Sequence, residues 1–522
     1  MGYTMEDWHP FLRMNDRQMT AVLIGLMVAM AAGVTALLFR SPAGVRVEKR
    51  VTDVEAERRA GTLKKESAAA AEPQTSGQGH AQGHAQAATP ESQGGGDVVE
   101  LKGTLETFDG KPAESRARWP RFRGGDFSNI STDSPPLAEA WGEKGPPVIW
   151  SVGLTEGHSG PAVWGGCVYV MDYDEKREGD SIRCFSLGDG REIWRRWYRS
   201  PTKRNHGISR AVPAVTEKYL LTMGPRCHVT CLDRATGAFR WGVDLVREYG
   251  AEVPMWYTGQ CPLIDDAGVA VLAPAGKVLL MGIDCETGKV LWQTPNPDGW
   301  KMSHSSVTLM TLLGRRTYVY SSLGGVVGVA ADGPDRGSVL WKSSEWTHSV
   351  ISPSPIAVDD HRVFLTAGYG GGSLMLGLKR AGDGVAAEVL YRLEKTVFSC
   401  EQQTPVLDHG CLFAVLPKDA AELRAQFACL SPEGKLLWTS GQADRFGLGP
   451  FFIADDKIFI LNDTGELTLV RSTARGNERL ARARVLHGRD AWAPMAIADG
   501  RLLLRDSEQL LCLDVRRNYP SR

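Results

Sequence analysis

Two stretches of the sequence decide the fold, LDRATGAFRW at Leu232–Trp241 and IDCETGKVLW at Ile283–Trp292. In each, an apolar segment leads to Asp and then Thr-Gly, and a second apolar segment ends in Trp. Asp and Thr side chains hydrogen-bond the backbone of a tight turn, and Gly237 and Gly288 supply the positive φ that the turn needs. The pattern predicts two strands joined by a short turn. Weaker copies are FSLGDGREIW at Phe185–Trp194 and LSPEGKLLW at Leu430–Trp438.

The tryptophan that ends each copy forms a column along the chain. An indole ring covers a large flat apolar area, which suits packing between neighbouring sheets. The column comprises Trp150, Trp194, Trp241, Trp292, Trp341 and Trp438.

A second column shows the period of the repeat. Each unit opens with a short apolar segment that carries a small residue or proline near its start. These segments begin at Gly160, Val212, Cys261, Ser306, Ser354, Thr404, Gly449 and Ala493. Eight copies recur at roughly 44 to 52 residues, and a period of that size with about four strands per unit is typical of a β-propeller. The sequence therefore predicts an all-β, eight-bladed propeller over residues 119–515.

The last unit, which ends near Val515, has only three predicted strands. A fourth is present upstream in PPVIWSVGL, Pro146–Leu154, where Trp150 matches the tryptophan column. We expect this N-terminal strand to pair beside Cys512 and to close the ring, which leaves no open edge between the first and last blades.

The N-terminal region has a different composition. After a short tail at residues 1–18, Met19–Phe39 is an uncharged run long enough to span a bilayer core of about 30 Å. It predicts one transmembrane signal-anchor helix. The alternative is a cleaved signal peptide, with a tolerable cleavage site at Val34–Ala36. Basic residues on both flanks leave the orientation open.

Residues 40–118 are interpreted as a flexible, low-complexity linker. Ala, Gln, Gly, Ser and Pro dominate residues 70–96, and GHAQ is duplicated at Gly79–Gln86. Such a composition buries too little apolar surface to order itself. Two histidines here, His80 and His84, make a weak metal site, and no metal is expected in the chain.

Composition excludes several functions. The formal net charge of -1 gives no basic surplus for nucleic acid. No GxSxG, HExxH or P-loop motif is present, so nothing indicates a hydrolase or a nucleotide-binding enzyme. The ten cysteines include no CxxC, and six follow the repeat columns: Cys167, Cys184, Cys231, Cys411, Cys429 and Cys512. Buried cysteine behaves as a small apolar residue, so we expect mostly free buried thiols.

The candidate site lies in the loops that enter the inner strands, because in a propeller these loops converge on one face around the channel. Polar and aromatic residues at such a concave mouth predict a recognition site. The candidates are His158, His206, Arg210, Trp256, Tyr257, His304, Glu401, Gln402 and Trp492.

The Thr-Gly…Trp repeats resemble the propellers of bacterial quinoproteins and of the outer-membrane assembly lipoprotein BamB. The stretches WPRFRGGDFSNIS at Trp119–Ser131 and GHSGPAVWGGCVYVMD at Gly157–Asp172 are similar to the opening of bacterial proteins that carry repeats of the pyrroloquinoline-quinone (PQQ) type. The resemblance implies a propeller outside the cytoplasm, and together with the predicted anchor at Met19–Phe39 we expect a single-pass protein of the bacterial inner membrane. The resemblance also implies a non-catalytic protein-binding or scaffold module with membrane-proximal protein partners, for example in envelope-protein assembly.

The alternative that the resemblance implies is a PQQ-dependent dehydrogenase of alcohols or sugars. Such an enzyme would hold the quinone in the channel between a Trp and, in many members, a disulfide of adjacent cysteines. Glu and Asn would hold calcium, and Asp would act as base. The sequence has no adjacent cysteine pair and no CxxCH, and no carboxylate set is assignable to a cation. We therefore expect no catalytic residue and no cofactor, with PQQ and calcium only under the alternative.

Overall fold

A computed structural model, which describes residues 98–382 and 384–517, has the Thr-Gly turns in the predicted form. Strand β10 (His228–Asp233) enters one such turn and β11 (Phe239–Asp244) leaves it. Asp233 Oδ1 accepts hydrogen bonds from the backbone N–H of Thr236 at 2.9 Å and from its hydroxyl at 2.7 Å. Gly237 has a φ of 70°. Local side-chain chemistry thus sets the hairpin that the fold repeats.

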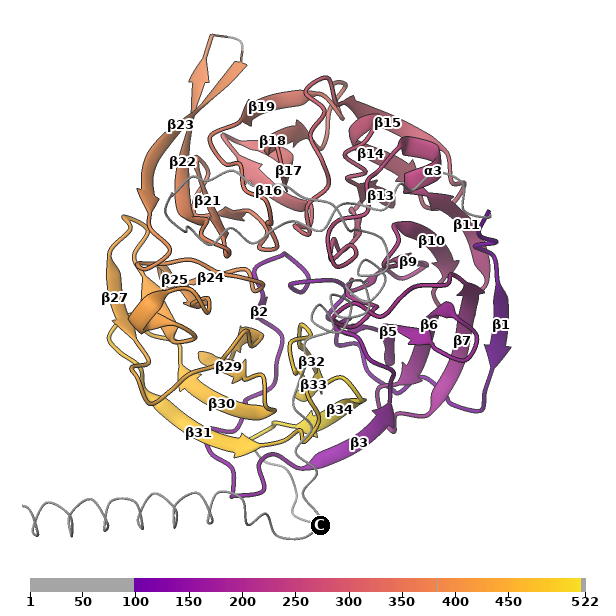
Figure 1. Cartoon of the computed structure of the whole chain (residues 1–522). Helices are drawn as coiled ribbons and strands as arrows, with labels where there is room; N and C mark the ends of the chain where they lie inside the picture. The colour runs from indigo at the N-terminus through magenta and orange to yellow at the C-terminus, as the bar shows by residue number, and fades with distance from the viewer. Residues whose placement is uncertain (1–97, 383, 518–522) are drawn as a thin grey trace, which may run out of the picture. The chain divides into compact units, whose positions relative to one another are not determined.

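The hairpins build eight antiparallel sheets, arranged as the blades of a ring (Figure 1). Blade 1 comprises β4 (Ala162–Trp164), β5 (Cys167–Asp174), β6 (Gly179–Ser186) and β7 (Glu192–Arg199). Blade 2 comprises β8 (Ala214–Val215), β9 (Tyr219–Met223), β10 and β11, followed by helix α3 (Leu245–Tyr249). Blade 3 comprises β12 (Leu263–Ile264), β13 (Val269–Leu272), β14 (Val278–Asp284) and β15 (Val290–Pro295). Blade 4 comprises β16 (Thr308–Leu312), β17 (Arg315–Ser322), β18 (Gly325–Ala330) and β19 (Val339–Ser343).

The other half of the ring continues the same order. Blade 5 comprises β20 (Ile356–Ala357), β21 (Arg362–Ala367), β22 (Gly372–Ala381) and β23 (Gly384–Leu393). Blade 6 comprises β24 (Val406–Asp408), β25 (Cys411–Val415), β26 (Phe427–Leu430) and β27 (Leu436–Thr439), with a short 3-10 helix at Ala421–Leu423. Blade 7 comprises β28 (Phe451–Ala454), β29 (Lys457–Leu461), β30 (Glu466–Arg471) and β31 (Arg479–Arg484). Blade 8 comprises β32 (Ala496–Ala498), β33 (Arg501–Arg505), β34 (Gln509–Asp514) and β3 (Val148–Gly153).

The predicted closure is confirmed. Strand β3 pairs antiparallel with β34, and Trp150 lies opposite Cys512 in the register. The outermost strand of the last blade therefore comes from a segment that precedes the first blade in sequence, and the eight-bladed count holds.

The Thr-Gly and Trp positions of the repeat contact each other across blade boundaries. A Cβ added at Gly237 in blade 2 would lie 2.7 Å from the ring of Trp194 in blade 1. The same packing joins Gly288 to Trp241, and the Trp241 Nε1–H also donates to Cys285 O of the next blade at 3.0 Å. Glycine is required here for two reasons, its positive φ and the neighbouring indole. The repeat motif therefore encodes the junction between blades as well as the turn.

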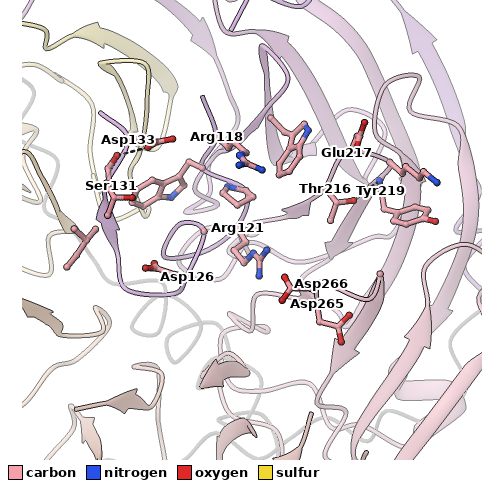
Figure 2. A pocket seen from close by; sticks show the side chains of 18 residues that line it. Arg118, Arg121, Asp126, Ser131, Asp133, Thr216, Glu217, Tyr219, Asp265 and Asp266 are labelled. Carbon is pink, nitrogen blue, oxygen red and sulfur yellow. Dashed lines mark hydrogen bonds between the residues drawn. The ribbon is translucent and has the colours of Figure 1, made fainter. Parts of the chain in front are cut away.

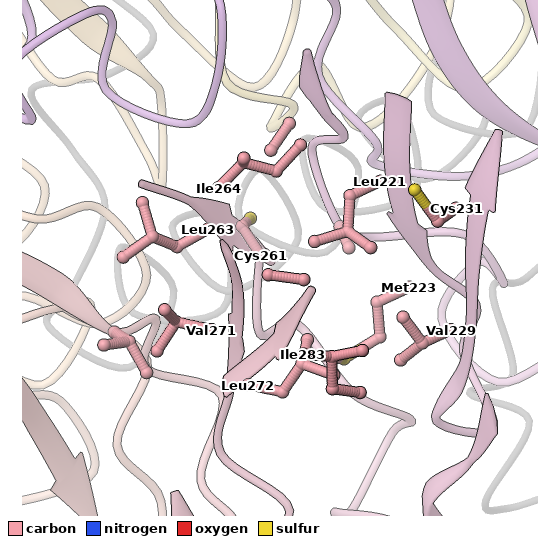
Figure 3. Close-up of a cluster of buried hydrophobic side chains, with 14 of the residues drawn as sticks. Leu221, Met223, Val229, Cys231, Cys261, Leu263, Ile264, Val271, Leu272 and Ile283 are labelled. Carbon is pink, nitrogen blue, oxygen red and sulfur yellow. The ribbon is translucent and has the colours of Figure 1, made fainter. Parts of the chain in front are cut away.

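Apolar side chains from adjacent sheets fill the space between blades. Figure 3 shows the junction of blades 2 and 3, where Leu221 and Met223 of blade 2 face Leu272 and Ile283 of blade 3. Cys231 belongs to the same cluster. All ten cysteines are buried and free in the structure, including the six that follow the repeat columns.

The folded part of the chain includes residues that the sequence analysis assigns to the linker. Residues 98–118, assigned above to the flexible linker, are placed against blade 1, and their strand β1 (Thr104–Thr107) pairs antiparallel with the outer strand β7. This part of the linker prediction was wrong because an added edge strand needs only backbone hydrogen bonds, which leave little trace in composition. The predicted membrane segment and the rest of the linker lie outside the described residues. Within residues 98–382 and 384–517, no helix is long and apolar enough to cross a membrane.

A segment at residues 119–131, named here the crossing segment, runs inside the ring from blade 1 to blade 7 (Figure 1). Trp119 bridges to Val163 of blade 1 at its start. At its end, β2 (Ile130–Ser131) pairs in parallel with β28.

Arg123 holds the middle of the crossing segment to blade 6. It is almost fully buried, and its Nη1 and Nη2 donate to the carbonyls of Thr404 at 3.0 Å and Pro405 at 2.9 Å. Further hydrogen bonds run to the carbonyls of Phe127 and Ser128 within the segment. Burial lowers the pKa of Arg123 to about 9, so the guanidinium stays charged at neutral pH.

Candidate functional site

The loops that lead into the inner strands surround a small cavity at one end of the channel, named here the mouth cavity. Its volume is about 120 Å³. Six predicted site residues line it, and Phe122 of the crossing segment lines it too. The predicted residues that it gathers are His158, Arg210, Trp256, His304, Gln402 and Trp492.

Arg210 contributes the one fixed charge of this lining. Its Nε donates to Trp256 O at 2.6 Å, and its Nη2 donates to the carbonyls of Asn205 at 2.9 Å and His206 at 2.8 Å. Burial lowers the pKa of Arg210 to about 10, which leaves it charged at neutral pH. Every acceptor of these hydrogen bonds is a main-chain carbonyl.

His158 is buried beside Arg210 and stacks on Trp492, with ring centroids 4.8 Å apart. Its Nε2 lies 2.9 Å from His206 O, and because a carbonyl only accepts, Nε2 carries the proton. Its Nδ1 is buried and has no hydrogen-bond partner in the part of the chain that the structure describes. Burial lowers the pKa of His158 to about 3, and the Arg210 charge adds to the effect, so the ring is neutral.

A second stack forms the opposite part of the lining. The Trp256 ring lies 6.3 Å from that of His304 and 5.7 Å from that of Tyr369, both nearly parallel. Burial lowers the pKa of His304 to about 4, again with a contribution from Arg210.

Four non-glycine residues at this end of the channel have a strained backbone, as do residues elsewhere in the propeller. Left-handed φ values occur at His206 (53°), Trp256 (64°), Tyr257 (71°) and Tyr369 (54°), none of which is glycine. Each such conformation costs of the order of 1–3 kcal/mol and is commonly retained at binding sites. The strain at these four residues is compatible with a binding site at the mouth, and similar φ values in turns of other blades show that it does not by itself identify one.

The remaining predicted residues lie near the cavity and do not line it. The side chain of His206 is exposed, and only its carbonyl joins the network, through Arg210 and His158. The Tyr257 hydroxyl donates to Lys203 O at 2.6 Å. Glu401 is buried, and its Oε1 pairs with Lys418 Nζ at 2.8 Å.

Among the lining residues that sequence reasoning missed are two aromatic ones, Tyr369 and Phe122. Tyr369 lies in the turn between β21 and β22, and burial and the Glu401 carboxylate raise the pKa of its hydroxyl. Phe122 lies in the crossing segment. The signal for Tyr369 was an aromatic residue within the Gly-rich stretch Gly368–Gly372.

A larger pocket of about 670 Å³ lies on the opposite face, where the inner strands end. The crossing segment and the turns after the inner strands of blades 1 to 3 line it, and Figure 2 shows Arg118, Arg121 and Asp126 around it. Its acidic turn residues are already paired, since Asp266 contacts Arg316 and Asp265 contacts Arg336. Sequence reasoning did not place a pocket here, although the Trp119–Ser131 motif marked the segment.

The mouth has no metal-binding geometry within the described residues. The one group of three potential metal ligands found there, Asp359, Asp360 and His361, lies on a largely exposed turn between β20 and β21. No carboxylate lines the mouth cavity, so the residues present do not fit a calcium ion with a carboxylate base beside it.

Comparison with known proteins agrees with this architecture. A family model described as outer membrane protein assembly factor BamB matches residues 178–432. No curated protein matches the sequence.

Solved structures share the fold at low identity. BamB from Moraxella catarrhalis is 13% identical, with a TM-score of 0.46 over 70% of this chain and 99% of that chain. The quinohemoprotein alcohol dehydrogenase of Comamonas testosteroni is 12% identical, with a TM-score of 0.51 over 78% of this chain and 82% of that chain. A quinohemoprotein alcohol dehydrogenase from Pseudomonas putida HK5 gives the same values. The family match over residues 178–432 and the ring of eight blades together show an eight-bladed β-propeller of the PQQ-like type.

Proposed function

We propose that this propeller is a non-catalytic binding module that recognises a protein partner at its mouth. The size of the mouth cavity carries the proposal. A water occupies about 30 Å³ of liquid, and small-molecule sites usually enclose about 300–1,000 Å³. A cavity of about 120 Å³ therefore suits a single side chain or chain end better than a tricyclic cofactor.

The crossing segment supports the same conclusion. It lies inside the ring, where a channel-bound quinone would sit, and Arg123 ties it to blade 6 through two buried carbonyls. A quinone bound at the mouth would have to displace Phe122 from the cavity lining. A quinone dehydrogenase also needs a cation and a carboxylate base near the substrate, and the lining supplies no carboxylate.

We further propose that the chain is a single-pass protein of the bacterial inner membrane, with the propeller outside the cytoplasm. Met19–Phe39 would be the anchor. The family model's description, an outer membrane protein assembly factor, favours envelope-protein assembly as the setting. A reporter that is active only in the cytoplasm, fused after Arg522, should be inactive; activity there would contradict this topology.

The binding proposal is tested by crosslinking in cells. A photo-reactive residue at Ser352, which lines the mouth cavity, should yield an adduct with another polypeptide. The matched control is the same residue at Glu217, which lines the pocket on the opposite face and should yield no such adduct. Equal crosslinking at both positions would contradict a recognition site at the mouth.

The alternative is tested by reconstitution of the purified chain with PQQ and calcium. We expect neither stoichiometric quinone binding nor dye reduction with alcohols or aldose sugars. Dye reduction that disappears when calcium is chelated would establish the dehydrogenase and overturn the binding proposal.

A further inference from the structure

The mouth cavity is electrostatically one-sided. Its lining contains one fixed charge, the Arg210 cation, and no carboxylate. Both histidines of the lining, His158 and His304, have pKa values lowered to about 3 and about 4, and are neutral at physiological pH. Burial lowers the pKa of Arg210, and the Glu156 carboxylate, which partly offsets this effect, pairs with Arg204 and does not line the cavity. A partly desolvated cation with no carboxylate in the cavity beside it favours an anionic ligand.

Arg210 has hydrogen-bonding capacity left for that ligand. Its Nε and Nη2 donate to three main-chain carbonyls. No carboxylate lies within 4.0 Å of its nitrogens among residues 98–382 and 384–517. Guanidinium–carboxylate hydrogen bonds are roughly twice as strong as neutral ones, so an incoming carboxylate is the matching acceptor.

His158 adds a second requirement. Its buried Nδ1 is an acceptor without a partner in the described chain. A carboxylate cannot satisfy it, because both groups only accept; the ligand must also bring an N–H or O–H. The end of a polypeptide carries both, since the last amide N–H lies one carbon from the terminal carboxylate.

We propose that the mouth binds the C-terminal carboxylate of a partner polypeptide. Arg210 pairs with the carboxylate, His158 Nδ1 accepts the amide N–H of the last residue, and the ring stack of Trp256, His304 and Tyr369 borders its side chain. This inference rests on the proposed function and names the group that the mouth recognises.

Three peptides separate the possible sources of the carboxylate: acetyl-trialanine with a free carboxylate, its C-terminal amide, and an amidated peptide whose only carboxylate is a glutamate side chain. Binding to the purified full-length chain is followed by ligand-observed NMR titration. We expect only the free-end peptide to bind, with a Kd of about 1 mM, the value for about 4 kcal/mol of interaction. Equal binding of the amide or of the glutamate peptide would overturn the proposal, as would no binding of the free-end peptide.

Variants assign the contacts. Arg210→Met should lower the affinity for the free-end peptide by at least about tenfold, the loss expected for a charge-assisted hydrogen bond. His158→Phe, which keeps a ring against Trp492, should weaken it by a smaller factor. Arg226→Met is the control, since Arg226 donates to Pro201 O nearby and does not line the cavity. Unchanged binding in Arg210→Met would overturn the proposal.

The same variants separate this inference from the proposed function. If the crosslinked partner is lost in Trp256→Ala but retained in Arg210→Met, the mouth is a recognition site and the carboxylate assignment is wrong. If the partner is retained in both variants, the proposed function itself fails.

Discussion

Two arginines lie inside the ring, Arg123 in the crossing segment and Arg210 at the mouth, and their surroundings differ. Arg123 donates through all three of its guanidinium nitrogens, to four carbonyls, and is almost fully buried. Arg210 is half-buried and donates from two nitrogens to three carbonyls. The difference teaches that a buried arginine in the channel does not by itself make a binding site. An arginine whose guanidinium nitrogens all donate to protein acceptors stabilises the fold, whereas one with a nitrogen still available can bind a ligand.

The largest loss of stability is expected for Arg123, whose guanidinium nitrogens all donate hydrogen bonds to carbonyls. Arg123→Met would leave the carbonyls of Thr404 and Pro405 buried without donors and release the crossing segment from blade 6. We expect the free energy of unfolding to fall by about 3–5 kcal/mol, measured by denaturant titration. Arg118→Met in the same region, where the guanidinium only covers the Trp164 ring, should cost less than about 1 kcal/mol. Similar losses in both variants would contradict a bracing role for Arg123.

Asp180 tests whether any unsatisfied buried group must mark a site. It is fully buried on β6, neither carboxylate oxygen has a hydrogen-bond partner in the described residues, and burial raises its pKa to about 7. The folded state therefore holds a proton that the unfolded chain releases near pH 4, so stability falls as the pH rises from about 4 to about 7.

Asp180→Asn should therefore stabilise the protein by a few kcal/mol at pH 8, and the gain should vanish near pH 4. Thermal unfolding across this pH range measures it. Peptide binding at the mouth should not change, because Asp180 does not line the mouth cavity. A gain that is independent of pH would show that the carboxyl does not titrate as stated.

Gly237→Ala sharpens the comparison by testing a contact in which no charged group takes part, the packing of Gly237 against the Trp194 ring. The new methyl group would meet the Trp194 ring at 2.7 Å at a residue with positive φ. We expect a loss of about 2–3 kcal/mol in denaturant titration. Gly314→Ala is the matched control, since Gly314 has a φ of 76° and nothing within 4 Å of the added carbon. It should lose only about 1 kcal/mol, and equal losses would mean that the indole contact is unimportant.

The smallest effect on stability is expected for Arg210→Met. Its three carbonyl acceptors lie in loops at the channel mouth. We therefore expect a loss of about 1 kcal/mol or less. The same variant should abolish most carboxylate binding, the reverse of the pattern for Arg123→Met. A loss as large as that of Arg123→Met would remove the distinction between the two arginines.

The ring was predictable because its information is local. The Asp-x-x-Thr-Gly turn at Asp233–Gly237 and the tryptophan column specify hairpins and their junctions within about fifty residues. Strand β1 was not predictable, since Thr104–Thr107 attaches through backbone pairing to a strand about ninety residues away, and an edge strand has no repeat of its own.

The mouth was partly predictable for the same reason. Loops before inner strands must converge, so His158, Arg210 and His304 could be grouped from the repeat alone. Tyr369 comes from a turn between the second and third strands, and Phe122 from outside the repeat, so the period gave no reason to place either at the mouth.

The closure of the ring has a consequence for synthesis. Strand β3 emerges from the ribosome early, and its partner β34 follows about 360 residues later, so at roughly 5–20 residues per second it waits about 20–70 s. The crossing segment waits almost as long for blades 6 and 7. During that interval β3 and the crossing segment lack the strands with which they pair in the native ring. They can take their final places only when the last blades have been synthesised.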